Sequence, residues 1–314
     1  MSADEDILDT LSACFLHKGT GRDKALDSTF AHRIQLCRAW GIRDEAAWRV
    51  LDVGCGQAES TAVLAYFVGD HGHATGLDPA APSYGAPFTL EQSQDYLKKS
   101  ALGPRITFVR SDLADFLHGR SDSGAVAFDA AVFCHSLWYL ADRDVVRAQF
   151  AALAKARIPR VLLAEYSTGS SDDDDAAAAA AAAKRPHQLA ARAQMRLHAL
   201  REQYPDPERS PSTLNIRGAL EVEELLAVAE DAGWSVARRG VVTPPEEMRD
   251  GYWEARIVTA PSFKEEVVSL RLPKEQEESV LRYIPQVEQA MAHLEAVDKP
   301  VATMDVVWAV LELQ

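Results

Sequence analysis

The chain contains 314 residues, of which 47% are hydrophobic and 25% charged, and its formal net charge at pH 7 is −14. This length is sufficient for one large domain with a substantial core, and the hydrophobic content is ordinary for a globular protein. A chain this acidic repels phosphate backbones, which argues against nucleic acid as a partner and favours a small molecule or a cationic partner.

The N-terminal composition and the spacing of the cysteines both favour a reducing compartment. No apolar run approaches the length of a membrane span, and Met1 to Asp9 is acidic where a signal peptide is basic and then apolar. The four cysteines, Cys14, Cys37, Cys55 and Cys134, form no C-x-x-C pair, so they indicate neither a zinc site nor a disulfide framework. We therefore expect a cytoplasmic protein with reduced thiols, no membrane partner and no metal, and the sequence leaves the oligomeric state open.

The first forty residues have a helical pattern. Apolar residues recur with helical spacing from about Ala3 to Trp40, and a loop from Lys18 to Arg22 interrupts them. We assign residues 1–45 to an N-terminal helical cap. The apolar positions are Leu8, Leu11, Phe15, Phe30, Ile34 and Cys37.

A glycine turn follows the first predicted strand. The apolar run from Val50 to Val53 leads into Gly54-Cys55-Gly56, and a helix is predicted from about Ala58 to Phe67. The glycines allow a tight turn and leave room for a ligand against the main chain, while the helix directs its free N–H groups to the same place. Glu59 stands where a dinucleotide fingerprint needs its third glycine, which disfavours a nicotinamide dehydrogenase.

Polar residues end the strands predicted further along the chain. Strands separated by helices of this length imply a parallel sheet, whose carboxyl ends bind ligands along one edge. A carboxylate such as Asp78 at a strand end can accept both hydroxyls of a ribose. The predicted strands are Ala74 to Leu77, followed by Asp78 and Pro79; Ile106 to Val109, followed by Ser111-Asp112-Leu113; Phe128 to Cys134, followed by His135; and Arg160 to Tyr166. Helices are predicted from about Leu90 to Ser100 and from about Asp142 to Ala156.

The run Asp52-Val53-Gly54-Cys55-Gly56, together with these strand ends in order, resembles the class I S-adenosylmethionine-dependent methyltransferases from roughly Trp48 to Tyr166. The resemblance implies a Rossmann-like, seven-stranded, mostly parallel sheet with an antiparallel last strand and helices on both faces. It implies S-adenosylmethionine as cofactor, with S-adenosylhomocysteine as product. The implied cofactor-binding residues are Asp52, Gly54, Gly56, Asp78, Pro79, Asp112, Leu113, Cys134 and His135.

We expect the core to span residues 46–170 and 219–314, separated by an insertion at 171–218. The insertion begins with serines, the aspartates Asp172 to Asp175 and eight alanines, a run that is either a helical extension or a loop. An amphipathic helix is predicted from Pro186 to about Tyr204, where methyltransferases commonly place a substrate lid. The N-terminal cap either covers the cofactor and substrate or only packs on the sheet edge.

The C-terminal part contains a further insertion, residues 243–273, with a strand-like segment from Tyr252 to Thr259. The arrangement of residues 160–260 resembles a fungal-type group of small-molecule methyltransferases. The other predicted elements are a helix from Glu221 to Ala232 capped by Gly233, a strand from Trp234 to Val242, a long helix from about Lys274 to Ala296 broken near Pro285, and a last strand from Met304 to Leu313.

Candidate catalytic residues follow the fourth and fifth strands. His135 is either a proton acceptor or a structural residue, and Glu165 either fixes an amine or is a solvated acid. Tyr139 and Trp138 either wall the methyl site, favouring a cationic centre, or are core aromatics. Trp138 and Tyr166 are also candidates for substrate binding. Further candidates in the inserted segments, each with a surface position as its alternative, are His187, Asn215, Arg217, Trp253 and Glu254. Lys18 and Arg22 are candidates to pair with the cofactor carboxylate.

The sequence therefore predicts transfer of a methyl group from S-adenosylmethionine to an O, N or S nucleophile of a small molecule by in-line displacement. The methyl donor is already activated, so this chemistry depends mainly on positioning and requires no catalytic triad. The alternatives are a regulatory protein that binds the cofactor without turnover and a protein methyltransferase whose acidic surface recruits a basic tail.

Overall fold

The strands form one mixed sheet. The computed structural model describes residues 3–17, 23–121, 127–168, 175–206, 208–209, 212, 214–218 and 220–314. Within these ranges the sheet has seven strands in the order β3-β2-β1-β4-β5-β7-β6, with β7 antiparallel to both of its neighbours. The strands are β1 (Arg49–Val53), β2 (His73–Leu77), β3 (Ile106–Val109), β4 (Ala130–Cys134), β5 (Arg160–Tyr166), β6 (Trp234–Val242) and β7 (Val306–Leu313). The predicted sheet is confirmed.

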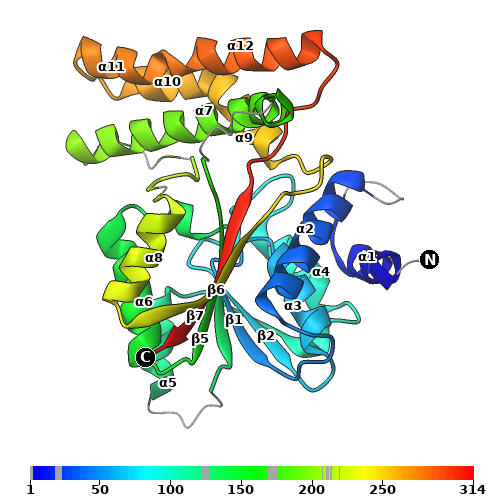
Figure 1. Cartoon of the computed structure of the whole chain (residues 1–314). Coiled ribbons are helices and arrows are strands. Elements are labelled where there is room, and N and C mark those ends of the chain that lie inside the picture. The colour runs from blue at the N-terminus through cyan, green and yellow to red at the C-terminus, as the bar shows by residue number, and fades with distance from the viewer. Residues whose placement is uncertain are drawn as a thin grey trace.

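Helices cover both faces of the sheet and one of its ends (Figure 1). The described helices are α1 (Ala3–Cys14), α2 (Lys24–Trp40), α3 (Glu59–Val68), α4 (Leu90–Lys98), α5 (Leu113–Ser121), α6 (Arg143–Lys155), α7 (Asp175–Gln203), α8 (Val222–Asp231), α9 (Asp250–Thr259), α10 (Pro261–Ser269), α11 (Lys274–Leu281) and α12 (Tyr283–Ala296), with short 3₁₀ turns at Gly103–Arg105 and Leu137–Tyr139. None of these helices combines the length and the apolar character needed to cross a membrane.

The sheet separates two hydrophobic cores because successive side chains of a strand point to opposite faces. In β4, Val132 and Cys134 belong to the core shared with α1, α2 and α3, whereas Ala131 and Phe133 belong to the core shared with α6 and α8. Both cores are built from residues with little or no exposed surface. The strand ends that carry the predicted site are therefore held from both sides.

A third core belongs to a helical layer made of α7 and α9 to α12. Figure 1 shows this layer at the end of the sheet that β5 approaches before the chain enters α7. α7 packs against α9 and α12, and Pro186 lies inside it. The buried residues of this core include Leu197, Leu200, Val258, Phe263 and Val267. The layer therefore lies at the ligand-binding edge of the parallel strands.

The prediction of a strand-like segment from Tyr252 to Thr259 is wrong, because this segment belongs to helix α9. Its buried residues, Gly251, Ala255 and Val258, have helical spacing. The break near Pro285 is confirmed, since α11 ends and α12 begins just before it. The alanine run is helical from Asp175, while the predictions for residues 18–22 and 172–174 fall outside the described residues.

Replacing Trp234 by Ala should destabilise the protein by about 3–5 kcal/mol, as expected for a large buried aromatic residue. Trp234 is completely buried, and its indole N–H donates to the carbonyl of Phe150 at 3.1 Å. Urea unfolding measures the change. The control is Trp253→Ala, since Trp253 is 59% exposed and should change stability by no more than about 0.5 kcal/mol. Similar losses in the two variants would contradict this assignment of the core.

Candidate functional site

The glycine turn joins the ends of β1 and β2. The backbone N–H groups of Gly54 and Cys55 donate to the carbonyl of Leu77 at 2.8 and 3.1 Å, and the N–H of Gly56 donates to Asp78 Oδ2 at 2.9 Å. Both glycines have positive φ, +75° at Gly54 and +52° at Gly56. A side chain in this region is strained, which explains why the sequence uses glycine here.

Asp52 lies behind the turn. It is 1% exposed and accepts a hydrogen bond from Thr61 Oγ1 at 2.6 Å, which ties β1 to the first turns of α3. Burial raises the pKa of Asp52 to about 7. From β4, Ser136 donates to the carbonyl of Val53 at 2.7 Å. The turn is thus fixed from three strands.

The remaining predicted cofactor residues lie along the same edge. Asp78 is half-buried and its Oδ1 accepts the N–H of Ala80 at 2.9 Å. Asp112 is exposed and its Oδ1 accepts the N–H of Asp115 in the first turn of α5, while Leu113 is buried in the core. Pro79 is exposed next to Asp78. Their roles toward a cofactor stay predictions.

Arg33 of α2 lies at this edge and was not predicted. Its Nε and Nη1 atoms are buried and have no hydrogen-bond partner among the described residues. Burial alone lowers the pKa of Arg33, but nearby acidic groups outweigh it and raise the pKa above its ordinary value. These groups belong to Glu59, Cys134, Tyr166 and Asp250. Two unpartnered guanidinium nitrogens indicate an anionic ligand, because unpaired buried polar groups are costly.

A pair of histidines joins α2 to the turn after β4. The Nε2 atoms of His32 and His135 are 3.0 Å apart, and His135 Nδ1 is 3.7 Å from Glu165 Oε1. His135 has φ of +56° and is 6% exposed. Burial lowers the pKa of both histidines well below the ordinary value, so both are neutral at pH 7. Because its pKa is lowered, His135 can accept a proton only where a nearby acid compensates the positive charge of the protonated ring.

Glu165 is buried, so it is not a solvated loop acid. Its Oε2 accepts the N–H groups of Leu137 and Trp138 at 3.1 and 3.2 Å, and its Oε1 accepts the N–H of Tyr166 at 3.0 Å. Burial raises the pKa of Glu165 to about 7 against the stabilising effect of these bonds. The carboxyl group therefore holds the backbone of the turn that follows β4.

Aromatic rings gather around Tyr166. Its ring centroid lies 4.3 Å from His135, 5.0 Å from His187 and 5.7 Å from Trp138. Tyr139 is 45% exposed, and yet burial raises the pKa of its hydroxyl well above the ordinary value. Tyr139 also lies close enough to Tyr166 for the two hydroxyl groups to interact electrostatically, so it borders these rings with part of its side chain open to solvent.

Two acidic residues of α9, Asp250 and Glu254, lie close enough to Tyr139 for their charges to act on its hydroxyl group. Tyr166 donates its hydroxyl hydrogen to Asp250 Oδ2 at 2.5 Å, and Gln194 of α7 donates to Glu254 Oε2. Burial raises the pKa of Glu254 to about 7. Asp250 was not predicted, and it stands four residues before Glu254 on one face of the helix.

The other predicted substrate residues are dispersed. Asn215 Oδ1 accepts the Tyr84 hydroxyl at 2.5 Å, and the N–H of Arg217 donates to the carbonyl of Trp138 at 2.8 Å. Trp253 packs on Tyr252 with ring centroids 5.2 Å apart and is mostly exposed. The structure therefore brings His187, Trp138 and Tyr166 together and leaves Trp253 at the surface.

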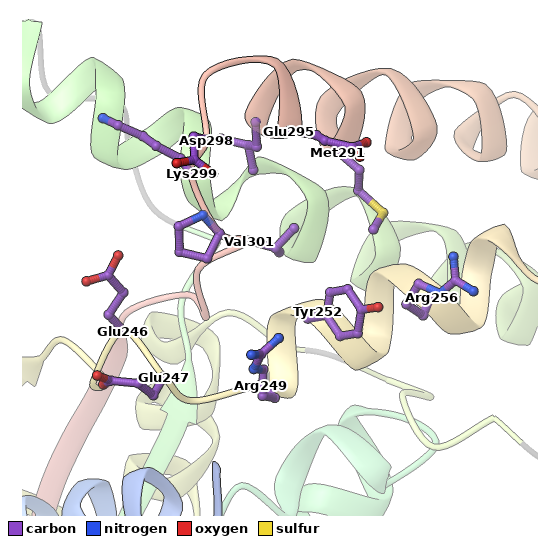
Figure 2. A pocket seen from close by; sticks show the side chains of 12 residues that line it. Glu246, Glu247, Arg249, Tyr252, Arg256, Met291, Glu295, Asp298, Lys299 and Val301 are labelled. Atoms are coloured by element: carbon purple, nitrogen blue, oxygen red, sulfur yellow. The ribbon is translucent and has the colours of Figure 1, made fainter. Parts of the chain in front are cut away.

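An outer hollow of about 750 Å³ lies on the opposite face of α9 (Figure 2). Arg249, Tyr252 and Arg256 line it at helical spacing, across from Glu295 of α12 and the segment 298–301. It contains none of the residues predicted from the sequence to form the site. The predicted site therefore lies away from this hollow, next to the face of α9 that carries Asp250 and Glu254, which we call its inner face.

No group of three or more His, Cys, Asp or Glu side chains within the described ranges has a geometry suited to a metal ion. The inner site offers one unpartnered cation, a glycine turn with open main chain, aromatic walls and carboxyl groups. Such a site can hold a ligand with a carboxylate, exclude water and compensate positive charge.

Comparisons with known proteins agree with this geometry. No protein-family model matches the chain. It is 36% identical to Methyltransferase phomM' and 35% identical to Methyltransferase phomM, both from Diaporthe leptostromiformis, across 98% of this chain and 90% of each relative. A cyclopropane-fatty-acyl-phospholipid synthase-like protein from Lactobacillus casei ATCC 334 is similar in structure, with a TM-score of 0.76 and 26% identity, covering 98% of this chain and 100% of that one. The similarity therefore includes the helical layer.

Replacing Gly54 by Ala should destabilise the protein more than replacing Gly56. An added Cβ at Gly54 lies 2.7 Å from Ser136 Cβ, whereas at Gly56 it meets no atom within 4 Å. Backbone strain alone predicts a loss of about 1–2 kcal/mol for Gly56→Ala, and the collision adds about 1–3 kcal/mol for Gly54→Ala. Urea unfolding of both variants measures the difference, and equal losses would argue against this packing of the turn.

Glu165→Gln should flatten the pH dependence of stability. Between the ordinary pKa of 4.5 and about 7, folded Glu165 keeps a proton that the unfolded chain has released, so its contribution to the free energy of unfolding falls as pH rises. In the variant this decrease in the free energy of unfolding, on the order of 3 kcal/mol between pH 4.5 and about 7, should be absent. Urea unfolding at pH 4.5, 5.5, 6.5 and 7.5 tests this. Parallel profiles for the two proteins would mean that Glu165 is ionised throughout.

Proposed function

This chain belongs to the class I S-adenosylmethionine-dependent methyltransferases, and from that premise we propose that it methylates an oxygen, nitrogen or sulfur atom of a small molecule. The observation that carries the proposal is the edge of the sheet where the glycine turn, two unpartnered nitrogens of Arg33 and the rings around Tyr166 lie together. The helical layer over this edge supports a small substrate in preference to a polymer. The four free, buried cysteines support a cytoplasmic location.

The residues present fit the amino acid end of the cofactor. The main chain at Gly56 borders open space, because a Cβ there would touch nothing. The guanidinium of Arg33 suits the cofactor carboxylate, the role predicted for Lys18 or Arg22. Glu59 begins α3 close enough to Arg33 for their charges to interact, and it suits the cofactor ammonium.

The other half of the cofactor is assigned to the ends of β2 and β3. We propose that Asp78 accepts the ribose hydroxyls with the lone pairs that Gly56 and Ala80 leave free. Asp112 and Leu113 then border the adenine. Asp52 acts indirectly in this proposal, since its carboxyl group is bonded to Thr61 behind the turn.

The cofactor supplies an activated methyl group on a sulfonium, and this chain's own residues orient the nucleophile and exclude water. Orientation alone contributes about 7–11 kcal/mol in favourable cases. His135 and Tyr139 line the methyl site in this proposal, beside Cys134 and Trp138. Glu165 keeps the turn that carries them in place through the backbone N–H groups of Leu137 and Trp138.

Arg33→Gln should weaken binding of S-adenosylhomocysteine about 10- to 100-fold, as expected for loss of a charge-assisted hydrogen bond. Isothermal titration calorimetry measures the affinity. Arg38→Gln is the matched control, because Arg38 lies on the same helix, is exposed and pairs with Asp4. If both variants bind like the wild type, Arg33 does not contact the cofactor.

The proposed function is tested by titrating the purified chain with S-adenosylmethionine, S-adenosylhomocysteine and NAD⁺ in parallel. Binding of the two sulfur compounds, followed by cofactor-dependent methylation of small molecules in an extract, is the expected result. Binding without any turnover would favour the regulatory alternative, and methylation of protein alone would favour a protein methyltransferase. If neither S-adenosylmethionine nor S-adenosylhomocysteine binds, the proposal is overturned.

A further inference from the structure

Five neighbouring side chains at the border between the sheet edge and the helical layer form what we call the acidic cluster: Tyr139, Tyr166, Gln194, Asp250 and Glu254. They come from the turn after β4, from β5, from α7 and from α9. The assignments under the proposed function leave Gln194, Asp250 and Glu254 without a role. Their chemistry indicates which nucleophile the site accepts.

The two carboxyl groups of the acidic cluster both come from α9. Asp250 and Glu254 are four residues apart on α9, so they project from one face of the helix. Tyr166 fixes Asp250 through its hydroxyl group, and Gln194 fixes Glu254 through its amide nitrogen. The outer hollow is lined from a different face of α9, so it shares neither acid.

An unpartnered acceptor lies next to these acids. Gln194 is completely buried, and its Oε1 has no hydrogen-bond partner among the described residues. Its amide nitrogen already faces Glu254, so the oxygen is free to accept a hydrogen from a ligand. A buried acceptor beside the Glu254 carboxyl group favours a ligand that donates N–H or O–H hydrogens.

The charges of the surrounding groups favour a positive ligand. Asp250 is close enough to Arg33, Glu59 and Tyr139 for its charge to act on each of them. Arg33 and Glu59 are matched by the two charged groups of the cofactor's amino acid end. His135 and His187 face Tyr166 as neutral rings, because burial lowers the pKa of His135 well below normal and that of His187 to about 3. With the cofactor carboxylate bound to Arg33 as proposed, the nearby cation that the two acids Asp250 and Glu254 share already has an anionic ligand.

We propose that the nucleophile is an amine that arrives as an ammonium ion, is held by Asp250 and the rings of Tyr139 and Tyr166, and is deprotonated by Glu254. Aromatic faces and carboxylates attract cations together. Gln194 Oε1 accepts a second ammonium hydrogen. The inference rests on the proposed methyl transfer and narrows its substrate class from O, N or S nucleophiles to amines.

The proton and electron balance is simple. The ammonium gives one proton to the Glu254 carboxylate, and the freed nitrogen lone pair forms the new N–C bond with the methyl carbon. The C–S bond of the sulfonium breaks and its electron pair stays on sulfur. A carboxyl group whose pKa burial has raised to about 7 is suited to accept that proton near neutral pH.

The test uses the full-length protein saturated with S-adenosylhomocysteine, which carries no transferable methyl group. Calorimetry compares three probes of similar shape: 2-phenylethylammonium, 2-phenylethanol and 3-phenylpropionate. We expect the ammonium to bind at least about tenfold more tightly than the alcohol, and the carboxylate to bind most weakly. An ammonium that binds no better than the alcohol would overturn the proposal, and this comparison requires no variant.

The variant Asp250→Asn with Glu254→Gln should abolish the preference for the ammonium. It should keep its affinity for S-adenosylhomocysteine within about threefold, since neither acid is assigned to the cofactor. The matched control, Glu246→Gln with Glu247→Gln, removes the same charge from the outer hollow and should bind all three probes like the wild type. An unchanged ammonium preference in the first variant, or an equal loss in both, would overturn the proposal. Failure of the wild type to bind S-adenosylhomocysteine would instead remove the proposed function itself.

Discussion

The rest of the structure depends on the hydrogen bonds that fix the turn between β1 and α3. Leu77 accepts two backbone N–H groups of this turn, Asp78 accepts a third, and Ser136 donates to the carbonyl that precedes it. Three neighbouring strands are thereby joined at one edge. Because Gly56 borders open space while Gly54 packs on Ser136, the same bonds that stabilise the fold also leave space for a ligand against the main chain at Gly56.

The sheet was predictable from the sequence because each strand is indicated by a short run of neighbouring apolar residues. Apolar runs define the strands, and the order of helix and strand defines a parallel topology, so the boundaries of β3, β5 and β6 agree with the structure at both ends. The strand-like segment 252–259 contains valine, isoleucine and aromatic residues, which favour strands. Packing of its Ala255 and Val258 against the helical layer overrides that preference and makes it helical.

The site was only half predictable, for a physical reason. Residues at strand ends converge by topology, which is why the sequence could predict that Gly54, Gly56 and Asp78 lie together, while their role toward a cofactor stays a prediction. Arg33 and Asp250 reach the site from α2 and α9, and no rule of spacing relates those helices to the strands. A signal for Arg33 was nevertheless present, because it lies three residues after Phe30 and four before Cys37, on the apolar face of α2. A lone cation on a buried face requires a partner or a ligand.

The two parts of the site have different freedom to change. Substitutions at the glycine turn disturb the junction of three strands, so the cofactor end is constrained by folding as well as by binding. The acids of α9 contact Tyr166 and Gln194 and no strand backbone, so their charge can change with less effect on the sheet. Proteins that share this sheet and helical layer can therefore differ in nucleophile through one face of one helix. Similarity across the whole chain establishes the methyl donor, whereas our proposal assigns the choice of the methyl acceptor to Asp250 and Glu254 of α9.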